Sequence, residues 1–199
     1  MKKLLIATNN KGKVIELQEL LKDTGIELVT PADINLNLEV EEDGKNYAEN
    51  ASKKAIAFAN ASGLISLADD SGLEVEALSG APGLYSARYS PKPGANDADR
   101  RNFLLQNVKD KPSPWKAHFH ATIAIAKPSG QVEVVEGNCF GEIIPEERGK
   151  GGFGYDPIFF LPEYNQTMAE LSMEEKNRLS HRALAVMNAI PVLKKIFGV

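Results

Sequence analysis

The amino-acid sequence predicts an α/β fold in which helices flank a mixed central sheet. Short apolar segments alternate with segments whose apolar residues recur at helical spacing, which is typical of this fold class. Two alternating segments, 118–126 and 132–140, flank the turn at 128–131 and predict an antiparallel hairpin inside the sheet. With 199 residues and 43% hydrophobic content, the chain can bury a core, and it has no internal repeat. We therefore expect a single domain over residues 1–199, with two lobes and a cleft between them.

The first part of the chain alternates apolar strands with amphipathic helices. Residues 3–7 predict a buried strand, and a polar loop leads from it into a helix over 14–22. A short strand is expected at 27–29. Asn46 can cap a second helix, with Glu49 as its capping-box partner three residues later.

The second part of the chain, from residue 64 onward, is expected to contain strands separated by the polar sequence 69–72 and three further helices. A strand over 64–68 is expected to end at the polar sequence 69–72, after which 73–78 alternates like a further strand. Further helices are expected over 96–108, 168–176 and 181–197.

The charge balance and the single cysteine limit the possible ligands and compartments. A net charge of -4, from 23 basic and 27 acidic residues, does not favour a nucleic-acid polymer, but a small phosphorylated ligand remains open. Cys139 is the only cysteine, so the chain can form no internal disulfide and has no zinc-like cysteine cluster. The start turns polar too early for a signal peptide, and no apolar stretch reaches the ~20 residues of a membrane span. A cytoplasmic protein without a membrane partner is expected.

The polar loop after the first strand is a candidate anion site. It lies where a strand ends and a helix begins, so free backbone amides and the positive end of the helix dipole favour anions there. Phosphate is the natural ligand, and a polar loop with an asparagine cap is an equally good alternative. The spacing excludes a P-loop. The candidate residues are Thr8, Asn9, Asn10, Lys11, Gly12 and Lys13.

Two adjacent carboxylates, Asp69 and Asp70, are a candidate metal site, and the acidic segment 39–43 offers further carboxylate ligands. Mg²⁺ takes one or two protein carboxylates while it keeps waters and bridges substrate phosphates. Neighbouring residues of a strand point to opposite faces, so one aspartate is expected to face the site and the other to brace it. Taken alone, the pair is better explained as a solvated acidic turn than as a metal site. The phosphate-binding loop predicted nearby makes the metal site the better interpretation.

A glycine-rich segment, 149–154, formally matches GxGxxG. The sequence after it looks extended rather than helical, so a dinucleotide fingerprint is not indicated. The glycines would let a ligand approach the backbone closely, with Phe153 as a stacking plate and Asp156 as an acceptor. The alternative is an ordinary turn that packs its aromatics into the core, which applies to Phe159 and Phe160.

The last helix begins with two basic residues. Ser180 can cap this helix, which puts His181 and Arg182 in its first turn, where the dipole disfavours cations. This conflict indicates a functional role. His118 and His120 alternate on a strand without a third nitrogen or sulfur ligand, so they are interpreted as packing or surface residues.

The chain closely resembles the inosine triphosphate pyrophosphatase family in four blocks that occur in the same order. These blocks are TNNKGK, ADDSGLEVEALSGAPGLYSARYS, GGFGYDPIFF and SHRALA. The resemblance implies an elongated fold whose central sheet joins two lobes, a nucleotide in the cleft, and a homodimer. It also implies hydrolysis of ITP, dITP and XTP to the monophosphate and pyrophosphate, with one or more Mg²⁺ per subunit.

The resemblance further implies a role for individual residues. Asp70 would be the acid–base residue with Asp69 beside it, Glu42 and Asp70 would hold Mg²⁺, and residues 8–13 would bind the triphosphate. Other substrate contacts implied by it are Lys54, Ser71, Phe153, Gly154, Tyr155, Asp156, Lys176, His181 and Arg182. Donors such as Arg182 would favour the acceptor oxygen of hypoxanthine and xanthine and reject the amino group of adenine.

A nucleotide-binding regulator that does not hydrolyse its ligand is the main alternative. It would keep the glycine-rich segment and the basic residues but would not need acidic metal ligands, so Asp69, Asp70 and Glu42 argue against it. A phosphotransferase is disfavoured because the chain lacks a P-loop and a kinase signature. Product analysis distinguishes the three classes.

Overall fold

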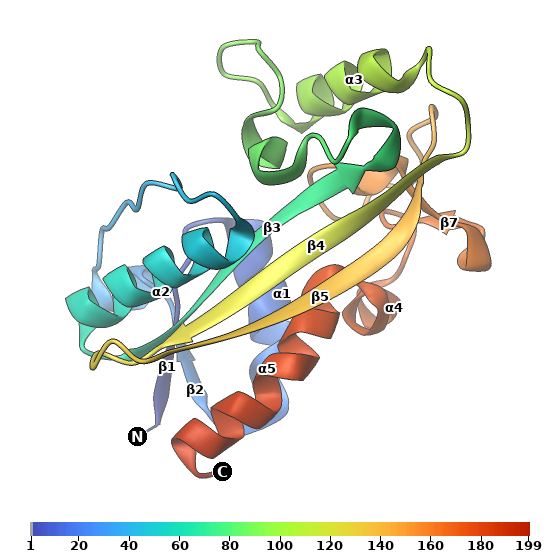
Figure 1. Ribbon diagram of the computed structural model, residues 1–199. Coiled ribbons are helices and arrows are strands. Elements are labelled where there is room, and N and C mark those ends of the chain that lie inside the picture. Colours follow the sequence, from blue (N-terminus) through green and yellow to red (C-terminus); the bar gives the residue numbers. More distant parts are fainter. Residues whose placement is uncertain (1) are drawn as a thin grey trace. The chain divides into compact units, whose positions relative to one another are not determined.

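The computed structural model describes residues 2–199, and in this range seven strands form one sheet flanked by helices (Figure 1). The strands are β1 (Lys3–Ile6), β2 (Glu27–Val29), β3 (Ile65–Val75), β4 (Trp115–Ala126), β5 (Val132–Ile143), β6 (Phe159–Leu161) and β7 (Gln166–Thr167). The helices are α1 (Lys11–Leu21), α2 (Tyr47–Ser62), α3 (Asp97–Val108), α4 (Met173–Leu179) and α5 (His181–Phe197).

The sheet is mixed, with strand order β2-β1-β3-β4-β5-β6-β7. β1 pairs in parallel with β2 and β3, whereas β6 pairs antiparallel with β5 and β7. A tight turn, closed by Lys127 N donating to Gln131 O at 2.9 Å, joins β4 to β5 as the predicted hairpin. The predicted α/β class with a mixed sheet is therefore confirmed.

The chain divides into two compact units. Unit 1 comprises Met1–Asp70, Ala121–Gly137 and Arg182–Val199, and unit 2 comprises Ser71–His120 and Asn138–His181. Three boundaries fall inside β3, β4 and β5, so each of these strands contributes residues to both units, and a fourth falls after His181, the first residue of α5. The single two-lobed domain stays a prediction.

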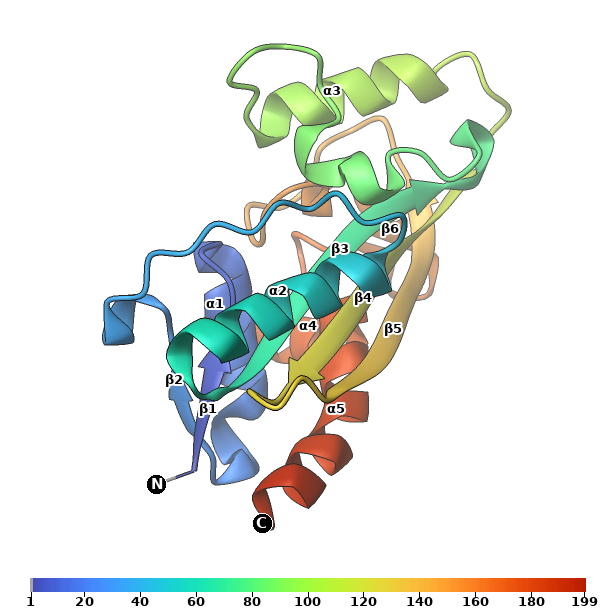
Figure 2. The ribbon, with the colours of Figure 1, turned by 60° about the vertical axis from the view of Figure 1, so that its left-hand side comes forward.

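Unit 1 carries an apolar core on each face of its strands. Leu4 and Ile6 pack with residues of α1 and α5, whereas Leu5 and Ala7 pack with residues of α2. This alternation follows from the two-residue period of a strand. Figure 2 shows α2 lying across one face of the strands. The helices on the two faces hold the carboxyl end of β1 and the middle of β3 in place. The polar residues of the candidate site lie at these two positions.

Unit 2 has one apolar core, built from its parts of the long strands and from α3. Phe119 and Phe159 pack there with ring centroids 4.5 Å apart. The Tyr155 hydroxyl donates to Ser86 O at 2.9 Å, which anchors the end of the glycine-rich segment in this core. Phe159 is buried as predicted, whereas Phe160 is half-buried beneath the Arg148 guanidinium.

β3 is one continuous strand, so the prediction that a strand ends at Ala68 before a loop over 69–72 is wrong. Asp69 and Asp70 lie in the middle of this strand and are only 1% and 7% exposed. Aspartate and glycine are depleted in strands, which is why the local sequence indicated a break. Charged partners from distant parts of the chain offset the cost of burying these carboxylates.

Helix beginnings follow their caps. Asn46 accepts from Glu49 N at 2.8 Å, and the Glu49 carboxylate accepts from Lys45 N at 2.8 Å and from Asn46 Nδ2 at 3.0 Å. The helix predicted over 168–176 is wrong in its bounds, because Ser172 and Glu175 form a capping box that starts α4 at Met173. None of the helices between residues 2 and 199 is long and apolar enough to cross a lipid bilayer.

Candidate functional site

The polar loop between β1 and α1 is held by its own side chains. Asn10 caps α1 by accepting from Lys13 N at 3.2 Å, and Asn10 N donates to the Thr8 hydroxyl at 3.2 Å. Asn9 and Lys11 are exposed, whereas Lys13 is half-buried. The predicted asparagine cap is therefore confirmed, and the anion site in this loop stays a prediction.

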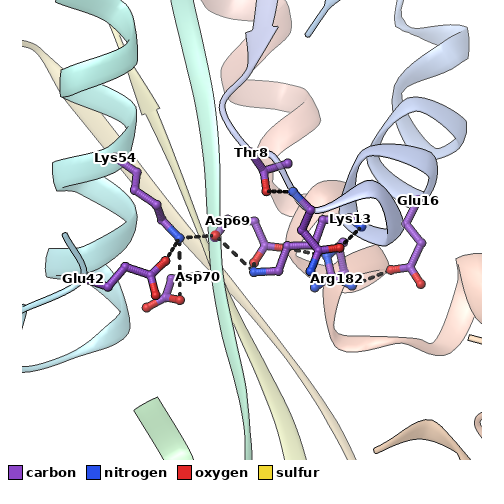
Figure 3. A network of polar contacts seen from close by, with 9 residues as sticks. Thr8, Lys13, Glu16, Glu42, Lys54, Asp69, Asp70 and Arg182 are labelled. Atoms are coloured by element: carbon purple, nitrogen blue, oxygen red, sulfur yellow. Dashed lines mark hydrogen bonds and ion pairs between the residues drawn. The ribbon is translucent and has the colours of Figure 1, made fainter. Parts of the chain in front are cut away.

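Asp69 lies in a buried ion cluster of unit 1 (Figure 3). Arg182 in the first turn of α5 donates through Nε to Asp69 and through Nη1 to Glu16 of α1. Lys13 Nζ lies 3.1 Å from Asp69 Oδ1 and 3.3 Å from Asp69 O. Arg182 is 1% exposed, so two buried carboxylates and two cations compensate one another within this cluster.

The ion cluster fixes the protonation of Asp69. Burial alone would raise the pKa of Asp69, but the charges of Arg182 and Lys13 lower it well below its usual range. Burial also lowers the pKa of Lys13, against the attraction of Asp69. Asp69 is therefore ionised at neutral pH and has too little proton affinity to act as a base.

Asp70 projects to the other side of β3 (Figure 3). Lys54 Nζ of α2 lies 3.7 Å from Asp70 Oδ1, 2.6 Å from Glu42 Oε1 and 2.8 Å from the backbone oxygen of Asp69. Burial raises the pKa of Asp70, while the charge of Lys54 opposes this shift and Glu42 adds to it. Of the two aspartates, Asp70 is thus the better proton acceptor.

Glu42 and Asp70 match the donor chemistry of Mg²⁺. Both carboxylates approach the same ammonium group, so they create a position that favours a cation. The described residues contain no group of three His, Cys, Asp or Glu side chains placed to hold a metal. Two carboxylates are nevertheless a sufficient protein contribution, because Mg²⁺ completes its shell with water and phosphate oxygens.

The backbone around Glu42 explains why it, and not Glu41, faces Lys54. Leu36, Leu38 and Val40 pack against the α2 core and alternate with exposed residues. Glu42 continues this inward series, whereas Glu41 is exposed. The two-residue alternation is visible in the sequence and puts Glu42, rather than its neighbour Glu41, on the side that faces α2.

The glycine-rich segment forms a second polar set, within unit 2. Asp156 Oδ2 accepts from Phe153 N at 3.0 Å and from Lys176 Nζ at 2.8 Å. Lys176 Nζ also lies 5.4 Å from the centroid of the Phe153 ring. Gly152 has φ +71°, and a Cβ there would lie 1.9 Å from Asp156 Oδ2. This position therefore requires glycine for both its backbone conformation and its space.

The structure brings the predicted residues together as two sets, one in each unit. The unit 1 set is Lys13, Glu42, Lys54, Asp69, Asp70 and Arg182. The unit 2 set is Phe153, Asp156 and Lys176. His181 stacks on Phe119 with ring centroids 4.7 Å apart, and Ser71 directly follows Asp70 on β3.

Arg182 and Glu16 were not expected to meet. Arg182 was predicted to contact the base, and its guanidinium contacts Asp69 and Glu16. Glu16 was missed altogether, although its position three residues after Lys13 puts both side chains on one face of α1.

Comparisons with known proteins agree over nearly the whole chain. The model of the Ham1 family matches residues 4–192. A dITP/XTP pyrophosphatase of Desulforamulus reducens is 50% identical over 196 residues, which cover 98% of this chain and 97% of that protein. One of Thermus thermophilus is 47% identical and covers 96% of this chain and 92% of its own length. The solved structure of a HAM1 protein from Coxiella burnetii has a TM-score of 0.88 at 40% identity and covers 98% of this chain and 100% of that one.

Proposed function

The chain belongs to the Ham1 family, and we propose that it hydrolyses ITP, dITP and XTP to the monophosphate and pyrophosphate. The relatives that are about half identical to it are named dITP/XTP pyrophosphatases. One observation carries the proposal at the level of residues. Asp69 and Asp70, neighbours on β3, have different partners, Arg182 and Lys13 for Asp69 and Lys54 for Asp70, which is the division that an acid–base site needs.

We assign the triphosphate and Mg²⁺ to unit 1. Glu42 and Asp70 would hold the ion, which when bound supplies charge neutralisation and acidifies a coordinated water. Lys54 supplies positive charge beside these carboxylates, Lys13 supplies it beside Asp69, and residues 8–13 supply the amides of the α1 terminus. Together these groups would stabilise the negative charge that develops on the departing pyrophosphate.

Asp70 is the proposed proton acceptor for the attacking water. Asp70 lies beside Glu42 and Lys54, on the side of β3 where the ion would be held, so its carboxylate can accept a proton from a water placed there. Asp69 stays ionised and holds Lys13 and Arg182 in place through its own ion pairs. The two neighbours thus have separate roles, one in proton transfer and one in positioning.

We assign the purine base to the unit 2 set. Phe153 offers a ring for stacking, and the buried Lys176 can donate to the acceptor oxygen at purine position 6. Adenine presents an amino donor there and would leave buried donors unsatisfied. The further predicted contacts in unit 2 are Ser71, Gly154, Tyr155 and His181. Arg182, which is buried in unit 1 against Asp69 and Glu16, is assigned to positioning rather than to base contact.

We also propose that the enzyme is a cytoplasmic homodimer that acts on free nucleotides rather than on nucleic-acid polymers. The cytoplasm holds the nucleotide pool on which such an activity would operate. Light scattering after size-exclusion chromatography tests the dimer, for which a mass of twice 21.7 kDa is expected.

A substrate panel tests the proposal. dITP, XTP, dGTP and dATP are supplied at equal concentration with Mg²⁺, and the phosphorus-containing products are identified. Pyrophosphate is expected from dITP and XTP about 100-fold faster than from dATP, a ratio typical of discrimination by hydrogen bonding in a pocket. Equal rates for all four nucleotides would refute the assignment. Binding without turnover would indicate the non-hydrolysing regulator.

A further inference from the structure

Both backbone groups of Gly154 are held by side chains of α3. Asp97 Oδ2 accepts from Gly154 N at 2.8 Å, and Arg101 Nη1 donates to Gly154 O at 2.8 Å. Asp97 and Arg101 are four residues apart, so one face of α3 presents both side chains. All three residues belong to unit 2. We call Asp97 and Arg101 the α3 clamp.

Arg101 is itself fixed by a bidentate ion pair. Its Nε and Nη2 donate to Glu147 Oε1 and Oε2 at 2.8 Å and 3.0 Å, and its side chain is 12% exposed. The remaining Nη1 donor is directed to Gly154 by this planar geometry. Glu147 precedes the glycine-rich segment and Gly154 lies near its end, so Arg101 ties the two ends of the segment together.

The segment between these ends has little conformational preference of its own. Gly149, Gly152 and Gly154 have φ of +83°, +71° and +62°. Glycine loses more backbone entropy on ordering than any other residue, so a single conformation needs external hydrogen bonds. Phe153 directly precedes Gly154, and any movement of the Gly154 peptide groups changes the position of the Phe153 ring.

We propose that Asp97 and Arg101 are positioning residues that preorganise the glycine-rich segment for the purine base. The clamp acts through Gly154 and Phe153 and does not touch the substrate. This inference rests on the proposed function, which assigns the base to Phe153 and Lys176. Preorganisation removes part of the ordering cost at binding, so the clamp sets KM and discrimination between bases rather than the rate of proton transfer.

Matched variants of α3 test the clamp. Arg101→Met and Asp97→Ala each remove one hydrogen bond to Gly154. Asp97→Asn keeps an acceptor oxygen, and Arg101→Lys cannot serve Glu147 and Gly154 together. Lys92→Met is the control, because it removes the exposed ion pair to Asp99 of the same helix at 2.7 Å and leaves Gly154 untouched.

The first measurement is amide hydrogen exchange of residues 149–156 in the free protein, and the second is the kinetics with dITP and dGTP. Arg101→Met and Asp97→Ala should accelerate exchange and raise KM for dITP about five- to twentyfold, the effect of losing one or two hydrogen bonds. Turnover at saturation should change less than about twofold. Asp97→Asn and Lys92→Met should resemble the parent, and Arg101→Lys should resemble Arg101→Met.

Unchanged exchange in Arg101→Met and Asp97→Ala would overturn the clamp. Faster exchange with unchanged KM and unchanged selectivity would also overturn it, because the order of the segment would then not serve binding. A parent enzyme that fails to hydrolyse dITP would refute the proposed function as a whole. If the parent hydrolyses dITP but the variants do not show the expected changes, only the clamp is refuted and the proposed function stands. The two outcomes are therefore distinguishable.

Discussion

The carboxylates of Asp69 and Asp70 lie on opposite sides of β3, although the two residues are adjacent in sequence (Figure 3). One side of the strand brings Asp69 to Arg182 and Lys13, and the other brings Asp70 to Lys54. The two-residue period of a strand therefore turns two identical side chains into chemically different groups.

Removal of the two charges should affect stability differently. Asp69→Asn leaves the buried Arg182 undercompensated, so we expect the free energy of unfolding at pH 7 to fall by about 3–5 kcal/mol. Asp70→Asn should leave it within about 0.5 kcal/mol of the parent value or raise it, because burial already disfavours the ionised form of Asp70. Urea unfolding followed by circular dichroism measures both changes. Equal losses in the two variants would contradict the assignment.

Metal removal should abolish activity, and the two neighbouring glutamates should differ in their effect on it. EDTA is expected to stop pyrophosphate release, and added Mg²⁺ is expected to restore it. Glu42→Gln should raise the Mg²⁺ concentration for half-maximal activity at least about tenfold, as is typical of losses around metal sites. Glu41→Gln is the matched control and should behave as the parent, because Glu41 is exposed. The reverse order of the two effects would show that the ligand was misassigned.

Gly152→Ala should weaken substrate binding through a specific clash. A Cβ at this position would meet Asp156 Oδ2, which accepts from Lys176. We expect KM for dITP to rise about tenfold or more, since the buried ion pair would be displaced. Gly130→Ala controls for backbone strain, because Gly130 also has a positive φ, of +88°, but a Cβ there would meet nothing within 4 Å. Similar KM changes in both variants would rule out the clash as the cause.

The α3 clamp should persist in mildly acidic solution. Burial alone would raise the pKa of Asp97, but the hydrogen bond from Gly154 and the charges of Arg100 and Arg101 lower it. A lowered pKa means that the stabilisation is complete above the unfolded value of about 3.9 and is lost as the pH falls through the folded value. Protection of residues 149–156 against exchange, relative to Asp97→Ala, should therefore stay constant from pH 7 to about 4.5. A loss of protection between pH 7 and 5 would contradict this account.

Local signals in the sequence predicted many elements well. The strand at 27–29 matches β2, the predicted cap Asn46 starts α2, and the helix predicted over 96–108 matches α3. Short-range hydrogen bonds decide where a helix begins, so these signals are readable from a few residues. β3 was predicted wrongly because charged partners from other elements compensate its central aspartates, and one of them, Arg182, lies 113 residues away from Asp69 in the chain.

The sequence indicated the residues of the candidate site but not their partners. The family resemblance picked out Asp69, Asp70 and Arg182, while their contacts join segments that no local pattern connects. Glu16 pairs with Arg182 across 166 residues, and Arg101 reaches Gly154 across 53. Such pairings depend on how the elements pack, so they became visible only in the folded chain.

The most direct test of the central claim is phosphorus NMR of dITP incubated with Mg²⁺ and either the parent enzyme or Asp70→Asn. We predict that the parent converts dITP to dIMP and pyrophosphate, and that a folded Asp70→Asn variant is slower by about a thousandfold, within the range for loss of a general base. Release of dIDP and orthophosphate by the parent, or undiminished pyrophosphate release by Asp70→Asn, would contradict it.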